Sequence, residues 1–188
     1  MPAALLPREE VVSRILTVFR DYGYEGASLA RLSEATGLGR SSLYHYFPNG
    51  KDDMAAAALA SVSAWFDDYV LQPLSGSEPP RERVRQFASG LAEYYQHGSK
   101  ACLMNLFTIG DAGERFQKAL RERLRTMLRA LATVAEESGI DAEEAKRRAE
   151  NALIDVQGAL VISRALGTRA PFARVMDELP ERLLSRRR

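Results

Sequence analysis

Cysteine is almost absent from this sequence: Cys102 is the only one among 188 residues. A single thiol cannot close an intrachain disulfide, which excludes a disulfide-stabilised scaffold and favours a reducing compartment. The sequence also lacks an apolar run of about 18 residues, so it predicts no membrane-spanning helix. Its opening residues, MPAALLPREE, are too short and too acidic for a signal peptide. We therefore expect a soluble, cytoplasmic protein without a membrane partner.

An excess of one charge is missing as well, because the formal net charge is +1 although 27% of the residues are charged. A protein that coats nucleic acid regardless of sequence would carry a large basic excess, so this class is disfavoured. A sequence-specific DNA-binding protein needs only a local basic patch, and this class stays open.

The sequence is poor in catalytic motifs. Its two histidines, His45 and His97, lie far apart, and it contains no HExxH motif, no G-x-S-x-G elbow and no phosphate loop. The segment 37–39, GLG, begins a G-x-G-x-x-G pattern, but Ser42 occupies the sixth position and no strand precedes it. We therefore predict no enzyme activity, no cofactor and no metal site.

The most informative stretch is 28–51, SLARLSEATGLGRSSLYHYFPNGK. Leu29 and Leu32 fall on one helical face, Ser28 can cap that helix, and Gly37 ends it where a left-handed conformation costs least. A second, short helix begins at Gly39 or residue 40 and is closed by a proline at position 48. This spacing predicts a helix-turn-helix.

The second helix points Leu43 and Phe47 inward, which leaves its polar side chains outside. Arginine and histidine can reach base edges or phosphates, and serine and tyrosine hydroxyls can bond to phosphate oxygens. An ordinary helical hairpin with a solvated polar face is the alternative reading of the same spacing.

The run 36–47, TGLGRSSLYHYF, followed by Pro48 and Lys51, resembles the recognition-helix signature of the tetracycline-repressor (TetR) family, A-G-V-S-x-x-x-L-Y-x-H-F with a lysine shortly after. Three residues depart from it: Thr36 replaces alanine, Gly39 replaces the capping serine, and Tyr46 replaces histidine. Glycine at an N-cap costs only a few tenths of a kcal/mol relative to serine, so the helix should form. The preceding run 19–24, FRDYGY, is similar to the family's F-x-x-x-G-[YF].

This resemblance implies a transcriptional regulator, most often a repressor, that binds a palindromic double-stranded DNA operator as a homodimer. Two recognition helices would enter successive major grooves about 34–36 Å apart. The residues expected to reach base edges are Arg40, Ser41, Ser42 and His45. Those expected to contact phosphates are Ser28, Tyr44, Tyr46 and Lys51.

Apolar residues recur at helical spacing through the rest of the chain, and no strand pattern appears. We predict an all-α protein with an N-terminal three-helix head (1–50, the DNA-binding domain) and a C-terminal bundle (51–188, the ligand-binding and dimerisation domain). About nine helices are expected, with a loop at 73–80. Besides the two above, they span 8–22, 49–71, 81–97, 101–109, 114–138, 142–166 and 172–184, and the basic end 186–188 is expected to be a solvated tail.

The second half of the helix 142–166 is apolar around most of its circumference, so it is either central or docked on another chain. The C-terminal helix pair resembles the face through which the family forms homodimers, and C-terminal motifs such as Q-G-A-L-V resemble one branch of the family. The implied interface residues are Leu153, Val156, Gln157, Leu160, Arg164, Phe172, Val175, Met176 and Leu179.

A small-molecule pocket inside the C-terminal bundle is the family's usual device, and its occupation would move the helix 49–71 and change the separation of the two heads. The many aromatic residues and methionines indicate an uncharged or weakly polar, aromatic or lipophilic ligand. Core packing is the alternative role for each residue. The candidate lining residues are Trp65, Phe66, Tyr69, Phe87, Leu91, Tyr94, Tyr95, Cys102, Met104, Asn105, Phe107, Phe116, Met127 and Gln157.

Two other hypotheses remain from the sequence. Cys102, beside Lys100 and near His97, would sense oxidants or electrophiles if its pKa were depressed; a small buried apolar residue is the alternative. A helical ligand-binding or scaffold protein without specific DNA binding would keep only the C-terminal half of the prediction.

Overall fold

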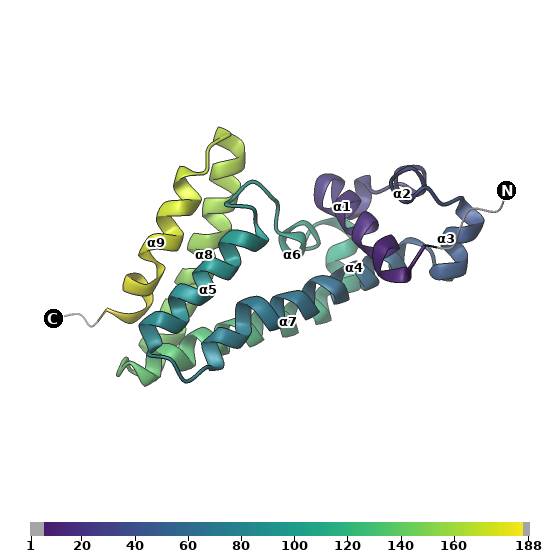
Figure 1. The fold of residues 1–188 in the computed structure, drawn as a ribbon. Helices are drawn as coiled ribbons and strands as arrows, with labels where there is room; N and C mark the ends of the chain where they lie inside the picture. Colours follow the sequence, from purple (N-terminus) through teal and green to yellow (C-terminus); the bar gives the residue numbers. More distant parts are fainter. Residues whose placement is uncertain (1–5, 186–188) are drawn as a thin grey trace. The chain divides into compact units, whose positions relative to one another are not determined.

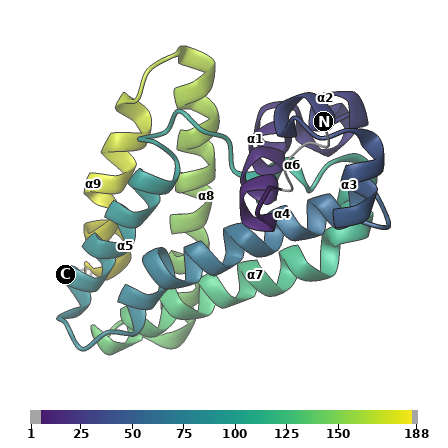
Figure 2. The ribbon, with the colours of Figure 1, turned by 45° about the vertical axis from the view of Figure 1, so that its right-hand side comes forward.

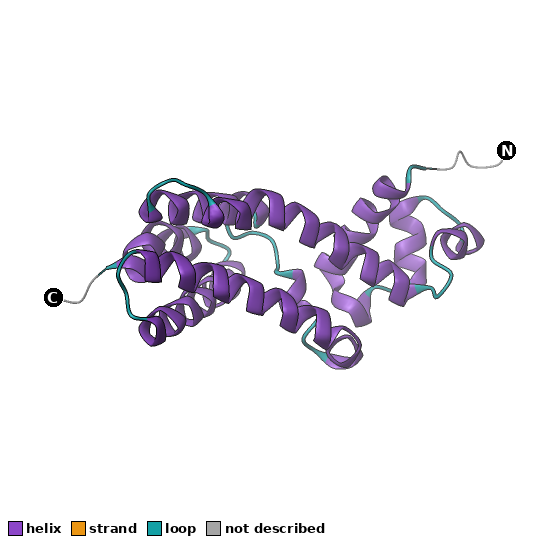
Figure 3. Cartoon of the chain, turned by 90° about the horizontal axis from the view of Figure 1, so that it is seen from below, coloured by secondary structure: helices purple, strands orange, loops and turns teal. Residues whose placement is uncertain are grey.

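The computed structural model describes residues 6–185, and within this range the chain forms nine α-helices and no strand. Figures 1 and 3 show these helices joined by loops and turns. The all-α prediction is confirmed. Residues 1–5 and the expected basic tail at 186–188 lie outside the described residues.

The described chain divides into two compact units. The N-terminal unit comprises the residues up to Ala64 together with Leu103–Lys118, and the C-terminal unit comprises Trp65–Cys102 together with the residues from Ala119 on. The chain therefore leaves the N-terminal unit and later returns to it. The predicted division at residue 50 does not include this return. That boundary remains a prediction about function.

The N-terminal unit contains α1 (Arg8–Gly26), α2 (Leu29–Thr36), α3 (Arg40–Tyr46) and α4 (Lys51–Phe66) except for its last two residues. The later segment adds α6 (Leu103–Leu106) and the start of α7 (Gly110–Glu137). These elements bury an apolar core against one another. Its members with 0% exposure include Val11, Ile15, Phe19, Leu32, Leu43, Phe47, Met54 and Phe107.

The C-terminal unit is built on α5 (Pro80–Tyr94), α8 (Ala142–Leu166) and α9 (Ala170–Leu184). Helix α9 packs against both α5 and α8, as Figures 1 and 2 show. Asp141 caps α8, since its carboxylate accepts from the Glu144 N–H at 3.0 Å. Helix α8 has the predicted bounds, and α9 starts earlier than predicted because proline is tolerated in a first turn. The helix also continues through Pro180.

Several predicted elements differ from the structure. Helix α1 runs to Gly26 rather than to residue 22, and α5 ends at Tyr94 rather than at residue 97, because Gln96 and His97 have positive φ. The helix predicted at 49–71 ends its α-helical geometry at Phe66 and continues as a π-helical turn, Asp67–Leu71, and a 3₁₀ turn, Gln72–Ser75. The predicted loop 73–80 is therefore partly helical. The helix predicted at 101–109 shrinks to the single turn of α6, and α7 begins at Gly110. A Cβ at Gly113 would lie 2.8 Å from the Thr108 carbonyl oxygen, so only glycine allows this tight turn.

No helix among the described residues is both long enough and apolar enough to cross a membrane.

Helix α5 lies close to the π-helical turn at Gly90, where an added Cβ would lie 2.7 Å from the Tyr69 carbonyl oxygen. A backbone oxygen cannot move aside like a flexible side chain. We expect Gly90→Ala to lower the free energy of unfolding by about 1–3 kcal/mol, measured by urea denaturation. Ser89→Ala, at the exposed neighbouring position, should change it by less than about 0.5 kcal/mol. Equal effects of both substitutions would contradict the close approach.

Candidate nucleic-acid interface

Helices α2 and α3 are joined by a turn whose polar atoms are satisfied locally. Ser28 Oγ accepts from the Arg31 N–H at 3.3 Å, and Gly37 ends α2 in the left-handed region with φ 70°. Thr36, fully buried, donates from Oγ1 to the Leu32 carbonyl at 2.7 Å and accepts from the Leu38 N–H at 3.3 Å. The threonine that departs from the family pattern therefore stabilises the turn, and the predicted cap and helix stop are confirmed.

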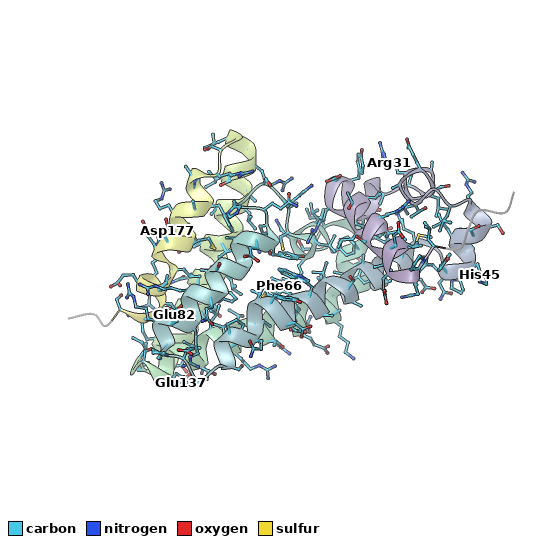
Figure 4. All side chains as sticks on the ribbon, in the orientation of Figure 1. Arg31, His45, Phe66, Glu82, Glu137 and Asp177 are labelled. Carbon is cyan, nitrogen blue, oxygen red and sulfur yellow. The ribbon has the colours of Figure 1, made fainter. Side chains whose placement is uncertain are left out.

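The outer face of α3 presents the polar residues that the sequence predicted. Leu43 and Phe47 are fully buried and fix the inner face of the segment. Arg40, Ser41 and His45 are exposed, as is Tyr44 at 45%, while Ser42 and Tyr46 are half-buried. His45 marks this helix in Figure 4. A guanidinium, an imidazole and hydroxyl groups therefore share one short, solvent-facing helix.

Three of the four predicted phosphate contacts already have intramolecular partners, and Tyr46 and Ser28 are two of them. The Tyr46 hydroxyl donates to the Leu6 carbonyl at 2.6 Å, so its hydrogen is used within the chain. Ser28 Oγ acts as an acceptor in the cap, which leaves its hydroxyl hydrogen for an external acceptor. Their contacts with DNA remain predictions.

Lys51, at the start of α4, is held from one side by Tyr24. Its ammonium donates to the Tyr24 carbonyl at 3.1 Å and lies 4.2 Å from the centre of the Tyr24 ring. The Tyr24 hydroxyl donates to Asp52, which also forms an ion pair with Arg115. Burial, reinforced by the hydrogen bond to Asp52, raises the pKa of Tyr24 to about 12. The phenol, which is protonated at physiological pH in any case, therefore keeps its proton for Asp52 to a higher pH than an ordinary tyrosine.

Arg31, an exposed residue in the first turn of α2, was not among the predicted site residues (Figure 4). Its guanidinium donates to the Gly26 carbonyl at 2.8 Å and lies 4.3 Å from the centre of the Tyr22 ring. Both contacts orient a cation beside the helix start that Ser28 caps. The sequence feature that could have indicated this residue is an arginine three positions after the capping Ser28.

The predicted pocket residues fall into both units. Met104, Asn105, Phe107 and Phe116 belong to the N-terminal unit. The Phe107 ring packs edge-on against Phe19, with centroids 5.5 Å apart, and lies 5.4 Å from Phe116. Within its unit, Phe107 therefore has the environment of a core residue.

The other ten candidates belong to the C-terminal unit, where four of them form an aromatic cluster. The Trp65 ring stacks on Tyr69 at 5.0 Å and on Tyr94 at 5.4 Å between centroids, and Tyr94 meets Tyr95 edge-on at 4.7 Å. Tyr69 is 61% exposed, whereas Tyr95 is buried. Phe66, Phe87, Leu91 and Met127 are buried as well.

The interior beside Tyr95 contains a buried polar atom without a hydrogen-bond partner, the Gln157 Oε1. Burial, and then the neighbouring Cys102, hold the pKa of Tyr95 well above its usual range. The Gln157 side chain also reaches the Tyr95 hydroxyl, yet its Oε1 is buried without a hydrogen-bond partner. Cys102 itself is 5% exposed, which limits the access of oxidants to its thiol.

The residues predicted for a dimer interface are mostly internal. Six of the nine are buried within the chain, where they contribute to the core of the C-terminal unit: Val156, Leu160, Phe172, Val175, Met176 and Leu179. Arg164 is exposed, and Leu153 and Gln157 are half-buried. A different set lies exposed along one face of α8, called the α8 stripe below. It consists of Ile154, Gly158, Val161, Ile162, Ala165 and Leu166.

Among the described residues, no group of three or more histidine, cysteine, aspartate or glutamate side chains is arranged to hold a metal ion. The arrangement of α2 and α3 defines the chain as a helix-turn-helix protein with a polar outer face on its second short helix.

Comparisons with known proteins agree with this class. Residues 12–58 match the model of the bacterial regulatory proteins of the tetR family, and residues 80–178 match the model of the LmrA/YxaF-like transcriptional regulator C-terminal domain. The uncharacterized HTH-type transcriptional regulator YxaF of Bacillus subtilis is 22% identical over 92% of this chain and 93% of its own length.

Solved structures show the same fold. A TetR transcriptional regulator from Legionella pneumophila has a TM-score of 0.81 at 19% identity, covering 95% of this chain and 98% of that one. The TetR family regulator CifR, solved as a cysteine mutant with 26-base-pair operator DNA, has a TM-score of 0.77 at 24% identity, covering 96% and 98%.

The chain belongs to the TetR family of bacterial transcriptional regulators, and it is a DNA-binding regulator of transcription. These comparisons indicate a family of regulators and not of enzymes.

The start of α3 offers a test of the local geometry. Gly39 occupies the N-cap position in an extended conformation, no side chain caps the helix, and a Cβ there would meet nothing within 4 Å. We expect Gly39→Ser to raise the free energy of unfolding by roughly a few tenths of a kcal/mol. Gly37→Ser, at a φ of 70°, should lower it by about 1–2 kcal/mol. Urea denaturation measures both, and destabilisation by Gly39→Ser would contradict the capping geometry.

Proposed function

We propose that the chain represses transcription as a homodimer on a palindromic operator and that a small-molecule effector releases it. The observation that carries this proposal is the outer face of α3, which exposes Arg40, Ser41, Tyr44 and His45. Arginine reads guanine bidentately, while hydroxyl groups bond to phosphates or base edges. Ser28 and Lys51 would contact phosphates and fix the register of the helix. The proposed regulator would act on operator DNA in the cytoplasm.

The fixed backing of α3 supports direct readout. Because Leu43 and Phe47 are fully buried, the helix cannot rotate about its axis without exposing them. The angles at which Arg40 and His45 leave the surface are therefore set before DNA binds. Such preorganisation reduces the ordering cost of binding.

The α8 stripe supports homodimerisation. Ile154 is 66% exposed, Leu166 is 68% exposed, and Val161 and Ile162 are each 50% exposed. Apolar side chains at these spacings form one continuous face of a helix, which a second copy would remove from water. Homodimers are typical of the family, and two recognition helices give a palindromic operator its two half-sites.

The aromatic cluster of Trp65, Tyr69, Tyr94 and Tyr95 supports an aromatic or lipophilic effector bound in the C-terminal unit. The unpaired Gln157 Oε1 favours a ligand that donates a hydrogen bond, because pairing removes the cost of a buried lone acceptor. Trp65 lies on α4, the helix that also starts in the N-terminal unit. An effector that prefers one arrangement of α4 would shift the operator equilibrium by the difference between its affinities for the two arrangements.

The operator proposal is tested by selecting duplexes from a random-sequence pool with the purified protein and titrating the selected duplex against random duplex at several salt concentrations. We expect tight, salt-dependent binding of two subunits to a palindromic site. Arg40→Ala should lose about 1–3 kcal/mol of binding free energy and relax specificity at its base. Arg121→Ala, an exposed arginine on α7, is the control and should bind like the wild type. Equal binding of selected and random duplex would refute specific readout.

The dimer proposal is tested by Val161→Glu, which places a charge in the centre of the α8 stripe. Because Val161 is half exposed in the single chain, the charge is tolerated in a monomer and is unfavourable against a second apolar face. We expect a dimeric wild type and a folded, monomeric variant by analytical ultracentrifugation at micromolar concentration. Leu124→Glu, which changes an exposed leucine on α7, should stay dimeric. A wild type that sediments as a monomer, or a dimeric Val161→Glu variant, would contradict the assignment.

A further inference from the structure

The first turns of α7 belong to the N-terminal unit, although about 60 residues separate them from the first turn of α4 in the sequence. Two polar contacts hold them there. The Glu25 carboxylate accepts from the Asp111 N–H at the start of α7 at 3.0 Å. One helical turn later, the Arg115 guanidinium forms an ion pair with Asp52 in the first turn of α4.

A chain of three contacts links Arg115 to Lys51, the residue proposed to contact a phosphate. Arg115 bonds to one oxygen of Asp52, Oδ2, while the Tyr24 hydroxyl donates to the other, Oδ1. The backbone carbonyl and the ring of Tyr24 then hold the Lys51 ammonium. One carboxylate thus ties α7, α4 and the end of α1 together directly behind Lys51.

These contacts fix the position of the Lys51 ammonium but do not use all of its hydrogen-bond donors. An ammonium has three hydrogens, and only one is donated to the Tyr24 carbonyl, so two are left for a phosphate oxygen. Arg115 and Asp52 are 49% and 42% exposed, and ion pairs that exposed contribute little to stability. Their consequence is geometric, since they fix the first turn of α4 relative to Tyr24.

We propose that Arg115 is a positioning residue for the operator contact of Lys51, acting through Asp52 and Tyr24. This inference rests on the proposed function, in which Lys51 contacts an operator phosphate. It assigns part of the DNA-binding geometry to a residue outside the matched tetR-family segment 12–58. It also gives α7, which continues into the C-terminal unit, a direct contact with the start of α4.

The test is a double-mutant cycle in the full-length protein, with the duplex selected by the wild type as probe. Arg115→Gln should weaken operator binding by about two- to fivefold, the range typical of one exposed ion pair. Lys51→Gln should weaken binding and reduce the salt dependence by about one phosphate contact. Because Arg115 is inferred to act through Lys51, Arg115→Gln should cause no further loss in the Lys51→Gln background.

Two controls separate positioning from other effects. Arg121→Gln removes the same charge from an exposed site on the same helix and should leave affinity unchanged. Arg115→Lys keeps a donor for Asp52 and should restore most of the affinity. Urea denaturation of each variant shows whether the affinity change tracks a loss of folded protein, which would indicate a structural role and overturn the inference.

The outcomes distinguish this inference from the proposed function. Unchanged binding by Arg115→Gln, additive losses in the double variant, or an equal loss in Arg121→Gln would overturn the role of Arg115 while specific operator binding by the wild type persists. A wild type that selects no duplex would refute the proposed function and this inference with it.

Discussion

The helix-turn-helix of the N-terminal unit depends on the burial of Leu43 and Phe47. Helix α3 spans only Arg40–Tyr46, and an isolated helix of this length is unstable in water because nucleation costs more than a few hydrogen bonds return. Its existence therefore depends on tertiary packing, which includes its contact with α2. The same packing leaves the opposite face free for arginine, serine, tyrosine and histidine side chains. One apolar contact thus both forms the recognition helix and sets the direction of its polar residues.

Features that depend on neighbouring residues were predicted correctly from the sequence. Ser28 and Asp141 cap their helices as expected, and Gly37 ends α2 in the left-handed region, because capping and positive φ are local properties of a few side chains. The change from α to π and 3₁₀ geometry after Phe66 was missed. This turn lies against α5 at Gly90, about 20 residues later, and no local pattern signals that contact.

The two faces of α8 explain why the expected interface residues and the exposed ones differ. An apolar pattern around most of a helix indicates that more than one face is removed from water. It does not indicate which face packs within the chain and which packs against a second chain. The structure resolves this within the chain: Val156 and Leu160 are buried among helices of their own unit, whereas Ile154, Val161 and Leu166 are exposed. Likewise, the contact of Arg115 with Asp52 joins residues 63 positions apart, and the sequence carries no signal for it.

The aromatic cluster lies where α4 is least regular, which has a consequence for regulation. Trp65 and Phe66 end the α-helical part of α4, and Tyr69 lies in the π-helical turn that follows. Hydrogen-bond geometry is poorer in short π and 3₁₀ turns than in an α-helix, so rearranging this segment costs less than bending the helix at its centre. Yet Gly90 brings the α5 backbone against the Tyr69 carbonyl, and the Arg123 guanidinium lies 4.9 Å from the centre of the Phe66 ring while pairing with Asp67. These contacts hold an inherently adaptable turn in one arrangement. A ligand that competes with the stacking of Trp65 would therefore act on α4 at the place where its geometry is easiest to change.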